Sequence, residues 1–370
     1  MMPNSVFWCN KRVMITGHTG FKGSWLSLWL QSMGADVTGY ALQPACEPNL
    51  FTLCGLEQTM CSITGDIGDK ESLLQAIRDT KPEVIFHMAA QPLVRYSYLN
   101  PVETFSVNVL GTVNLLDAVR IALDEGIHIK ALLNVTTDKC YENREWLWGY
   151  REIDRLGGLD PYSSSKACSE LVTSSFRNSY FNPKLYASHG LSVATARAGN
   201  VIGGGDWSED RIVPDGMRAL LSGNRLRIRN PAATRPWQHV LEPLQGYLLL
   251  AERMVEQGAE FAEAWNFGPL EEGTRSVEWL VRTIGSCWGE DKYYELEEGN
   301  HPHEAFNLKL DSSKAREKLG WQPNWKVEKA VEKTVEWYRY YQEQADMKKV
   351  CLDQLAEYSL TGAEKQGGSG

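Results

Sequence analysis

The sequence contains no long run of apolar residues and no block of five charges of one sign. One of its longer apolar stretches, residues 246–251, is far shorter than the roughly 20 residues that a membrane-spanning helix needs. The 38 basic residues are outnumbered by 47 acidic ones, which gives a formal net charge of −9. These features argue against binding to nucleic acid and against a membrane-bound protein.

Pairs of cysteines at metal-binding or redox spacing are also missing. The eight cysteines form no Cys-x-x-Cys motif and no cluster with histidine at the spacing of a zinc site. Residues 1–8 lack the cationic and apolar segments of a secretory signal. We therefore expect reduced thiols, no metal and a cytoplasmic location.

The first half of the chain alternates short β-rich runs with amphipathic helical runs. This alternation is typical of an α/β fold with a Rossmann-type, doubly wound parallel sheet. The expected strands are residues 12–16, 35–40, 83–87, 130–135 and 191–197. The expected helices are residues 20–33, residues 101–122 and a helix that begins near Asp160.

The regular alternation ends at about Gly199. We predict a sheet domain over residues 1–199 and a smaller, irregular α/β lobe for substrate over residues 200–360, with the chain crossing back to the sheet near residues 235–270. Residues 315–319 and 327–341 are expected to be helical, and residues 361–370 to be a disordered tail. A ligand site is expected between the two lobes.

Three glycines at a spacing of three residues follow the first expected strand. Gly17 permits a tight turn, Gly20 lets the backbone approach a pyrophosphate, and Gly23 allows close packing of helix and strand. The free N–H groups of the following helix would bind the anion. The turn therefore predicts a dinucleotide site, with contacts from the intervening residues His18, Thr19, Phe21 and Lys22.

Charged side chains near the adenosine end of this site are scarce. The second strand lacks the usual acidic residue at its end, and no Lys or Arg occurs between Ser24 and Asp69. A ribose 2′-phosphate would find no cation unless Lys22 turned toward it, so NAD is favoured over NADP. Tyr40 could contact the ribose or only pack, and Asp66 with Ile67 could meet the adenine or cap a helix. The small-residue turn Ala89-Ala90-Gln91 is expected to pass under the cofactor.

Two polar clusters indicate catalysis. Tyr162 and Lys166 are one helical turn apart on one face. A neighbouring ammonium and a nicotinamide cation would lower the pKa of the phenol. Thr137, Asp138 and Lys139 follow the strand 130–135, at the carboxyl edge where such sheets hold ligands.

Several long strings around these residues resemble one family. They are residues 16–23, 87–92, 138–141, 197–207 and 235–240. The chain resembles the extended short-chain dehydrogenases/reductases, within them the nucleotide-sugar 4,6-dehydratases, and among these the enzymes that act on CDP-glucose. The resemblance implies that Thr137, Tyr162 and Lys166 oxidise C4 of the sugar with NAD, that Asp138 and Lys139 eliminate water across C5 and C6, and that hydride returns to C6. The product would be CDP-4-dehydro-6-deoxy-D-glucose, for dideoxyhexoses of O-antigen and lipopolysaccharide.

The chain departs from this family at one position. Most 4,6-dehydratases carry Asp-Glu where this chain carries Asp138-Lys139. Either a neutral Lys139 amine removes the C5 proton, or its ammonium stabilises the enolate while another group acts. We predict the base role, since nearby positive charges would depress the pKa of the amine.

Substrate contacts are expected from the second lobe. Arg211 and Arg235 suit a diphosphate, and Asn200 could bind it or a sugar hydroxyl. Gln238 and His301 are assigned to the substrate side as well; His301 and His303, two residues apart, lack a helical metal-binding face. The aromatic segment 141–159 could cover the sugar or pack against a neighbouring subunit.

Two other functions compete with dehydration. A nucleotide-sugar 4-epimerase shares the glycine turn, Thr137, Tyr162 and Lys166, but needs no acid to expel a 6-hydroxyl. A dinucleotide-sensing regulator could keep the fold without catalysis. The helices after Pro101 and Tyr162 would form a helical interface in this family, so a homodimer or homotetramer is expected.

Overall fold

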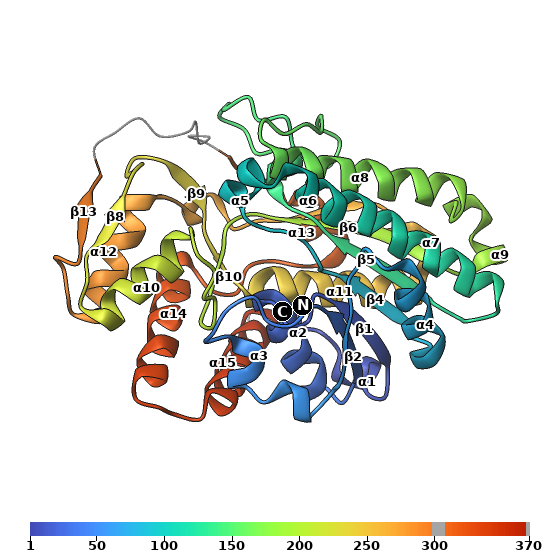
Figure 1. Ribbon diagram of the computed structural model, residues 1–370, viewed down its shortest axis with the longest axis horizontal. Helices are drawn as coiled ribbons and strands as arrows, with labels where there is room; N and C mark the ends of the chain where they lie inside the picture. Colours follow the sequence, from blue (N-terminus) through green and yellow to red (C-terminus); the bar gives the residue numbers. More distant parts are fainter. Residues whose placement is uncertain (298–307, 368–370) are drawn as a thin grey trace.

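The centre of the molecule is a parallel sheet of seven strands in a computed structural model that describes residues 1–297 and 308–367 (Figure 1). The strand order is β11-β6-β5-β4-β1-β2-β3, and every pair is parallel. The strands are β1 Arg12–Thr16, β2 Asp36–Ala41, β3 Cys61–Thr64, β4 Val84–His87, β5 Ala131–Val135, β6 Ser192–Ala198 and β11 Ala264–Phe267. The predicted doubly wound fold is confirmed, and the five predicted strand ranges agree within one residue at either end.

Alternate residues of the central strands enter two separate cores. On β1, Val13 and Ile15 belong to the core that includes helices α2 (Phe21–Ser32) and α11 (Leu241–Gln257). Met14 belongs to the core formed with α4 (Lys70–Thr80), α7 (Gly111–Asp124) and α8 (Pro161–Ser179). Both faces of the sheet are therefore covered by helices, as parallel sheets require.

The predicted helix after Pro101 is continuous but irregular. It runs through α6 (Pro101–Phe105), a π-helical turn (Ser106–Leu110) and α7. The whole segment is long and apolar enough to cross a membrane by length and composition. Its Leu115 and Val119 are fully buried in the core against the sheet, which is the position of a core helix.

The smaller lobe lies beside the carboxyl ends of the strands and appears at the left of Figure 1. It contains α10 (Ile212–Ser222), α12 (Val277–Trp288) and three short strand pairs. These pairs are β7 Val201–Ile202 with β10 Gln238–His239, β8 Leu226–Ile228 with β13 Tyr294–Leu296, and β9 Thr234–Pro236 with β12 Thr274–Ser276. Between them the chain returns to the large sheet through α11 and β11.

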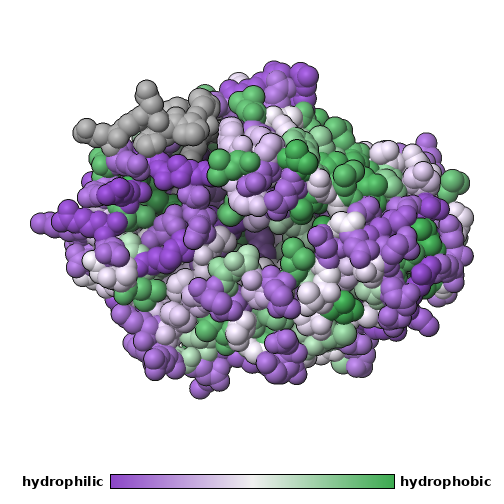
Figure 2. Space-filling model, in the orientation of Figure 1, coloured by the Kyte–Doolittle hydropathy of each residue, from purple (hydrophilic) through white to green (hydrophobic). Residues whose placement is uncertain are grey.

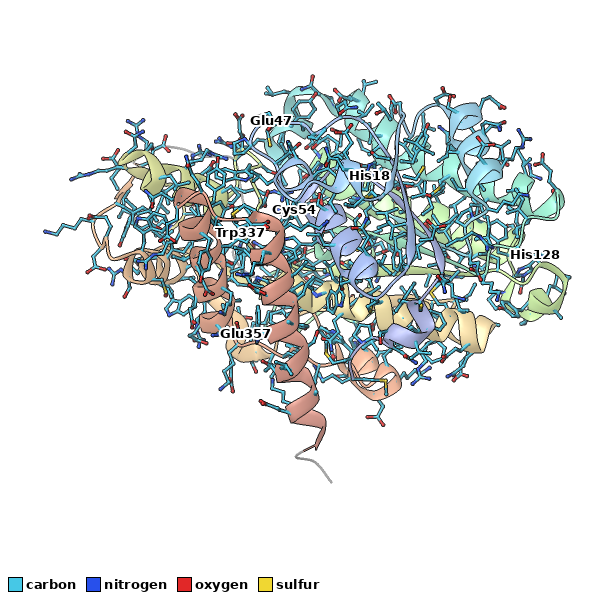
Figure 3. All side chains as sticks on the ribbon, turned by 90° about the horizontal axis from the view of Figure 1, so that it is seen from below. His18, Glu47, Cys54, His128, Trp337 and Glu357 are labelled. Atoms are coloured by element: carbon cyan, nitrogen blue, oxygen red, sulfur yellow. The ribbon has the colours of Figure 1, made fainter. Side chains whose placement is uncertain are left out.

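The C-terminal helices contact both parts of the molecule: the first and third pack on the sheet domain, and the second packs on the smaller lobe. Helices α13 (Ser313–Leu319) and α14 (Val327–Gln342) agree with the predicted helices. Helix α15 (Met347–Gly367) was not predicted, and residues 361–367 are helical rather than a disordered tail. The Sγ atom of Cys351 on α15 lies 3.2 Å from the indole nitrogen of Trp337 and 3.8 Å from Sγ of Cys54. Trp337 and Cys54 are labelled in Figure 3. The remaining short helices are α1 Ser5–Trp8, α3 Leu50–Leu53, α5 Val94–Leu99 and α9 Tyr186–His189.

Candidate active site

A deep cleft runs between the sheet domain and the smaller lobe. Its volume is about 1320 Å³, and Figure 2 shows a hollow near the middle of this face. The cleft lies over the carboxyl ends of β1, β4 and β5, where the strand order reverses between β1 and β4. Open α/β sheets bind ligands at this switch point.

The glycine turn has the geometry of a pyrophosphate site. Gly17 adopts φ +79°, and a Cβ there would lie 2.6 Å from the backbone nitrogen of Ala89. A Cβ on Gly23 would lie 2.2 Å from the carbonyl oxygen of Gly17, so only glycine fits. Helix α2 starts at Phe21 without a side-chain cap, which leaves its first N–H groups available to an anion. Thr19, Gly20, Phe21 and Lys22 line the cleft as predicted.

Tyr40 and Asp66 form the far end of this part of the cleft. The hydroxyl of Tyr40 donates to the carbonyl oxygen of Asp66 at 3.1 Å, and both residues line the cleft together with Ile67. Asp66 is not a helix cap, because Asp69 caps α4 by accepting from the backbone of Ser72. The alternative interpretation of Asp66 as a cap is therefore wrong.

His18 and Gln91 differ from the prediction of cofactor contact. The ring of His18 is fully buried, with Nε2 2.8 Å from Oγ of Ser62. The amide nitrogen of Gln91 donates to the carbonyl oxygen of Leu93 and to Oγ1 of Thr104. Both side chains hold loops together behind the cleft, whereas Ala89 and Ala90 line it.

Thr137, Tyr162 and Lys166 meet at one place in the cleft. The side chains of Tyr162 and Thr137 lie close enough to interact, and the Lys166 ammonium donates to the carbonyl oxygen of Val135 at 3.4 Å. Helix α8 starts at this place because Asp160 caps it and Pro161 occupies its first position. The predicted convergence of phenol, amine and hydroxyl is present.

The charge state of the phenol differs from the expectation. Burial raises the pKa of Tyr162 to about 12, although the Thr137 hydrogen bond and the Arg211 charge act in the opposite direction. Burial lowers the pKa of Lys166 to about 8. The expected lowering of the phenol pKa is therefore absent in the protein alone, because the loss of hydration outweighs the nearby positive charge.

Asp138 has the environment of a proton donor. Burial raises the pKa of its carboxyl group, against the charges of Lys139, Arg235 and Lys22. Its Oδ1 accepts from Oγ1 of Thr137 at 3.0 Å. Lys139 lines the cleft next to it and is half-buried.

The predicted substrate residues divide into two groups. Asn200, Arg211 and Arg235 line the cleft, and Arg211 pairs with Asp206 at 3.0 Å. Gln238 is buried and donates to the carbonyl oxygen of Phe267, so its role is structural. His301 lies outside the described residues.

Sequence reasoning missed two features, one in the wall of the cleft and one behind it. Arg227, Arg229 and Asn230 line it from β8 and the turn that follows. The alternating arginines of residues 225–229 were the available signal. Asn108, in the π-helical turn, donates to the carbonyl oxygen of Gln91 and to Ser165 of α8, and nothing in an apolar helical pattern marks such a residue.

The aromatic segment 141–159 packs on its own chain. The rings of Tyr141 and Trp146 both stack on the ring of Tyr150, and each ring centroid lies 5.1 Å from that of Tyr150. Tyr150 in turn pairs with Leu310. Asn143, Arg144, Glu145 and Leu159 line the cleft, so this segment forms part of its wall.

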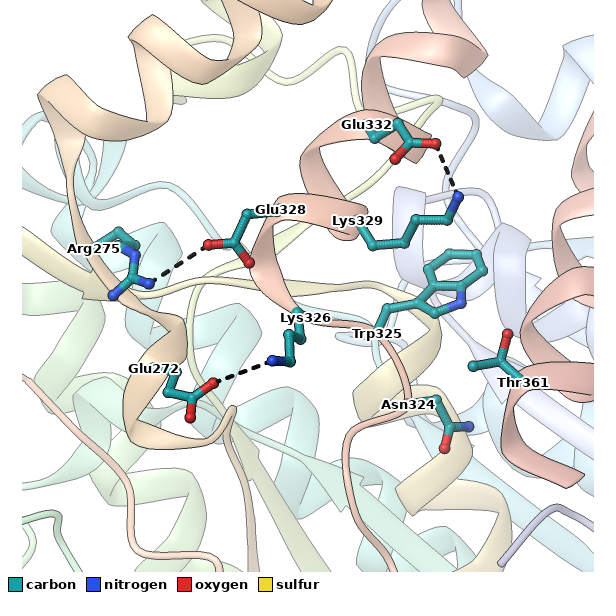
Figure 4. Close-up of a pocket in the computed structure, with 9 residues that line it drawn as sticks. All are labelled: Glu272, Arg275, Asn324, Trp325, Lys326, Glu328, Lys329, Glu332 and Thr361. Carbon is teal, nitrogen blue, oxygen red and sulfur yellow. Dashed lines mark hydrogen bonds and ion pairs between the residues drawn. The ribbon is translucent and has the colours of Figure 1, made fainter. Parts of the chain in front are cut away.

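A second hollow, of about 690 Å³, lies on the surface near α14 and α15 (Figure 4). It is lined by three ion pairs, which are Arg275–Glu328, Lys326–Glu272 and Lys329–Glu332. Its charges of both signs neutralise one another. The candidate catalytic residues all lie in the larger cleft instead.

Comparison with known proteins assigns the chain to a family. The model of the family described as GDP-mannose 4,6 dehydratase matches residues 14–334. The CDP-glucose 4,6-dehydratase of Salmonella typhimurium is 52% identical, over 96% of this chain and 98% of that protein. The chain belongs to the nucleotide-sugar 4,6-dehydratase family. The dTDP-glucose 4,6-dehydratase of Xanthomonas campestris is 28% identical to this family member, over 88% of this chain and 92% of that protein.

Solved structures share the fold of this family member at low identity. DesIV, a dTDP-glucose 4,6-dehydratase of Streptomyces venezuelae with NAD and DAU bound, has a TM-score of 0.75 at 24% identity, covering 91% of this chain and 99% of that chain. A UDP-glucose 4-epimerase of Thermotoga maritima has a TM-score of 0.75 at 23% identity, covering 89% and 99%. Dehydratases and epimerases share the fold, so the reaction has to be argued from the site.

Proposed function

We propose that the protein catalyses the NAD-dependent dehydration of CDP-D-glucose to CDP-4-dehydro-6-deoxy-D-glucose. The observation that carries this proposal is the buried carboxyl of Asp138, whose pKa burial raises, in the same cleft as Thr137 and Tyr162. The 52% identity to a CDP-glucose 4,6-dehydratase supports the choice of nucleotide.

The cleft suits NAD. Gly17, Gly20 and the start of α2 would hold the pyrophosphate, and Tyr40 with Asp66 would face the adenosine. Residues 24–68 contain no lysine or arginine that could pair with a 2′-phosphate, which supports NAD over NADP. When bound, the nicotinamide supplies the redox chemistry, as a temporary store of the hydride that moves from C4 to C6 of the sugar.

Tyr162 and Thr137 act at the 4-hydroxyl of the sugar. The phenol oxygen of Tyr162 takes the hydroxyl proton, and Oγ1 of Thr137 holds the same oxygen in place. The phenol needs activation, since burial alone raises its pKa to about 12. The positive charge of Lys166 at the base of the cleft favours the phenolate form.

Asp138 and Lys139 act at C6 and C5. A carbonyl at C4 acidifies the proton on C5, which the Lys139 amine removes. Asp138 then protonates the departing 6-hydroxyl, so that water leaves. Burial supports this role, because it keeps the carboxyl protonated at a higher pH than an exposed aspartate.

The diphosphate would be bound from the smaller lobe. Arg211 and Arg235 line the cleft and present guanidinium groups, and Asn200 lies between the catalytic edge and this lobe. Arg227 and Arg229 lie further along the same wall, where they pair with Glu295 at 3.2 Å and with Glu297 at 3.1 Å. We place the nucleoside along this wall.

The test is incubation of the purified protein and NAD with CDP-glucose, dTDP-glucose, UDP-glucose and GDP-mannose in parallel. We expect CDP-glucose to give a 4-keto-6-deoxy sugar without added reductant, scored by enone absorbance in alkali and by the new C6 methyl signal in NMR. Formation of the C4 epimer with the 6-hydroxyl retained would instead establish the epimerase. Product from another nucleotide sugar alone would overturn the assignment of CDP-glucose.

Tyr162→Phe separates an enzyme from a dinucleotide sensor. The phenylalanine keeps the ring and removes the proton acceptor. We expect NAD to bind as in the wild type and product formation to fall at least about 10³-fold. Unchanged biological activity of this variant in cells would support the sensor.

We also propose a homo-oligomer. Apolar side chains on α5, α6 and α8 are exposed, among them Leu99, Val102 and Leu171. A helical interface of two copies would cover them. Analytical ultracentrifugation should give two or four times the 41.7 kDa chain mass, and a monomer at micromolar concentration would contradict this.

A cytoplasmic location and a role in making dideoxyhexoses for surface polysaccharide complete the proposal. All eight cysteines are free thiols, which suits a reducing compartment. Fractionation of cells that express the protein tests the location, and loss of dideoxyhexose from surface polysaccharide in a deletion strain tests the role.

A further inference from the structure

A buried ion pair lies directly behind the catalytic helix. Glu170 follows Lys166 by four residues on α8, so the two share one face of the helix. The carboxylate of Glu170 is buried and accepts two hydrogen bonds from the guanidinium of Arg197, at 2.9 and 2.8 Å. Bidentate pairs of this kind fix both distance and orientation.

The same carboxylate reaches two neighbouring strands. Oγ1 of Thr136, at the end of β5, donates to it at 2.5 Å, and Oγ1 of Thr195 on β6 donates at 2.8 Å. Thr136 directly precedes Thr137 and Asp138. A single carboxylate with four bonds therefore sets how α8, which carries Tyr162, lies against the strand end that carries Thr137.

Arg197 extends this arrangement to the aromatic wall of the cleft. Its Nη1 donates to the hydroxyl of Tyr141 at 2.7 Å and to the carbonyl oxygen of Glu152 at 3.1 Å. The Tyr141 hydroxyl donates in turn to Asn266 on β11 at 2.8 Å. The segment 141–159 is thus attached to the same buried pair as the catalytic helix.

Glu170 also faces the amine of Lys166. The other groups around that amine are Cys140, Lys22 on α2 and His87 on β4, besides Tyr162 one turn away. Burial lowers the pKa of His87 to about 3 and raises the thiol pKa of Cys140, so both are neutral near pH 7. Lys22 is a second cation, which leaves Glu170 as the anion of this group. Its charge raises the pKa of Lys166 against the effect of burial.

We propose that Glu170, held by Arg197, is a positioning residue of the catalytic site: it fixes α8 against the end of β5 and provides the negative charge behind Lys166. This inference rests on the proposed function for its kinetic consequences. The charge state of Lys166 can be measured without any substrate.

The experiment compares Glu170→Gln, which removes the charge at nearly constant shape, with Glu170→Asp, which keeps the charge. In protein labelled with ¹³C-lysine, with Lys166→Arg used for assignment, we expect the Lys166 titration to move down by about one pH unit in Glu170→Gln and to stay near the wild-type value in Glu170→Asp. With CDP-glucose, kcat of Glu170→Gln should fall about 100-fold, with KM within about threefold and the alkaline limb of the pH profile moved to lower pH.

Two further variants keep the proposal open to refutation. If Glu170→Gln does not fold, the double variant Glu170→Gln with Arg197→Met removes both charges together. It should shift the Lys166 titration in the same direction but by less, because the opposing charge of Arg197 is lost as well. The matched control is Glu125→Gln, which removes a carboxylate from an exposed pair with Arg78 and should change neither titration nor kcat.

An unchanged Lys166 titration in Glu170→Gln would overturn the proposal. It would also be overturned if kcat fell only in proportion to the loss of folded protein while the pH profile of kcat stayed in place. If the wild type does not turn over CDP-glucose, the proposed function fails, whereas the lysine titration still decides the role of Glu170.

Discussion

Thr137 donates through Oγ1 to one carboxylate oxygen of Asp138, at 3.0 Å. Within the described part of the chain, the other oxygen, Oδ2, is buried and has no hydrogen-bond partner. Gly199 lies so close that a Cβ there would be 3.1 Å from Oδ2. In the proposed mechanism, Thr137 would orient the carboxyl of Asp138 through Oδ1, and the unpartnered Oδ2 would carry the proton that is donated.

The variant Asp138→Asn tests whether Asp138 is the acid that protonates the leaving 6-hydroxyl. The amide keeps the shape and the contact with Thr137 but cannot deliver a proton. We expect kcat to fall about 10²–10⁴-fold, measured by enone absorbance. The melting temperature should not fall, because the replaced group is one whose charged form burial disfavours. Asp124→Asn, in an exposed pair on α7, is the control, and wild-type turnover of Asp138→Asn would refute the acid role.

Lys139→Met tests the base at C5. Without the amine, exchange of the C5 proton with D₂O should slow at least about 100-fold, followed by NMR of the sugar. Lys139→Glu restores a base of the type usual in the family. If Lys139→Glu retains full exchange and full turnover, the amine has no special role. Lys184→Met, at an exposed position, controls for the loss of one positive charge.

Gly17→Ala tests the pyrophosphate turn. The new methyl group would lie 2.6 Å from the Ala89 backbone, so the turn has to open and NAD affinity should fall at least about tenfold, measured by calorimetry. Gly190→Ala is the matched control, because Gly190 also has a positive φ, +67°, but its Cβ would contact nothing within 4 Å. Both variants lose about 1 kcal/mol of stability from backbone strain. Equal NAD affinity in the two variants would contradict the assignment.

The buried carboxyl of Glu252 should make the free energy of unfolding depend on pH. Burial raises the pKa of its carboxyl to about 7, while Oε1 accepts from Asn4 and from the indole of Trp8. Because the folded-state pKa lies above the unfolded value of 4.5, the folded form binds more protons between pH 4.5 and 7, and stability falls as pH rises through this window.

The variant Glu252→Gln should remove this loss of stability at higher pH. The amide oxygen can accept the same two hydrogen bonds, and no charge is buried above pH 7. We expect the variant to be more stable than the wild type at pH 8, by at most about 3 kcal/mol, and similar at pH 4.5, from urea unfolding. Glu256→Gln, an exposed neighbour, should follow the wild type at both pH values. A Glu252→Gln curve parallel to that of the wild type would refute the assignment.

Sequence patterns predicted the parts of the fold that follow from periodicity. Strand β1 and the start of α8 agree with the predicted residues because an apolar run, a cap and a proline determine them locally. Helix α15 was missed, since its apolar residues lie on several faces and are buried by contacts with α2 and α14 that no local pattern records.

The sequence predicted the positions of the site residues that belong to catalytic motifs, and it predicted the roles of the other site residues less well. Thr137, Tyr162 and Lys166 meet as expected because parallel strands end at one edge. His18 and Gln238 stand within strings typical of the family, yet their side chains bond to the protein itself. A position in the sequence does not fix where a side chain points. The pKa of Tyr162 depends on burial, which sequence alone does not give.

The return of the chain to the sheet through β11 has a consequence for protein synthesis. Strand β11 pairs with β6, although about 65 residues, which include part of the smaller lobe and helix α11, separate the two along the chain. On the ribosome, β6 is an open edge until Phe267 has emerged, and Phe267 itself completes the core beneath it. The two lobes therefore mature together, and a nascent chain halted between them is the form most exposed to aggregation.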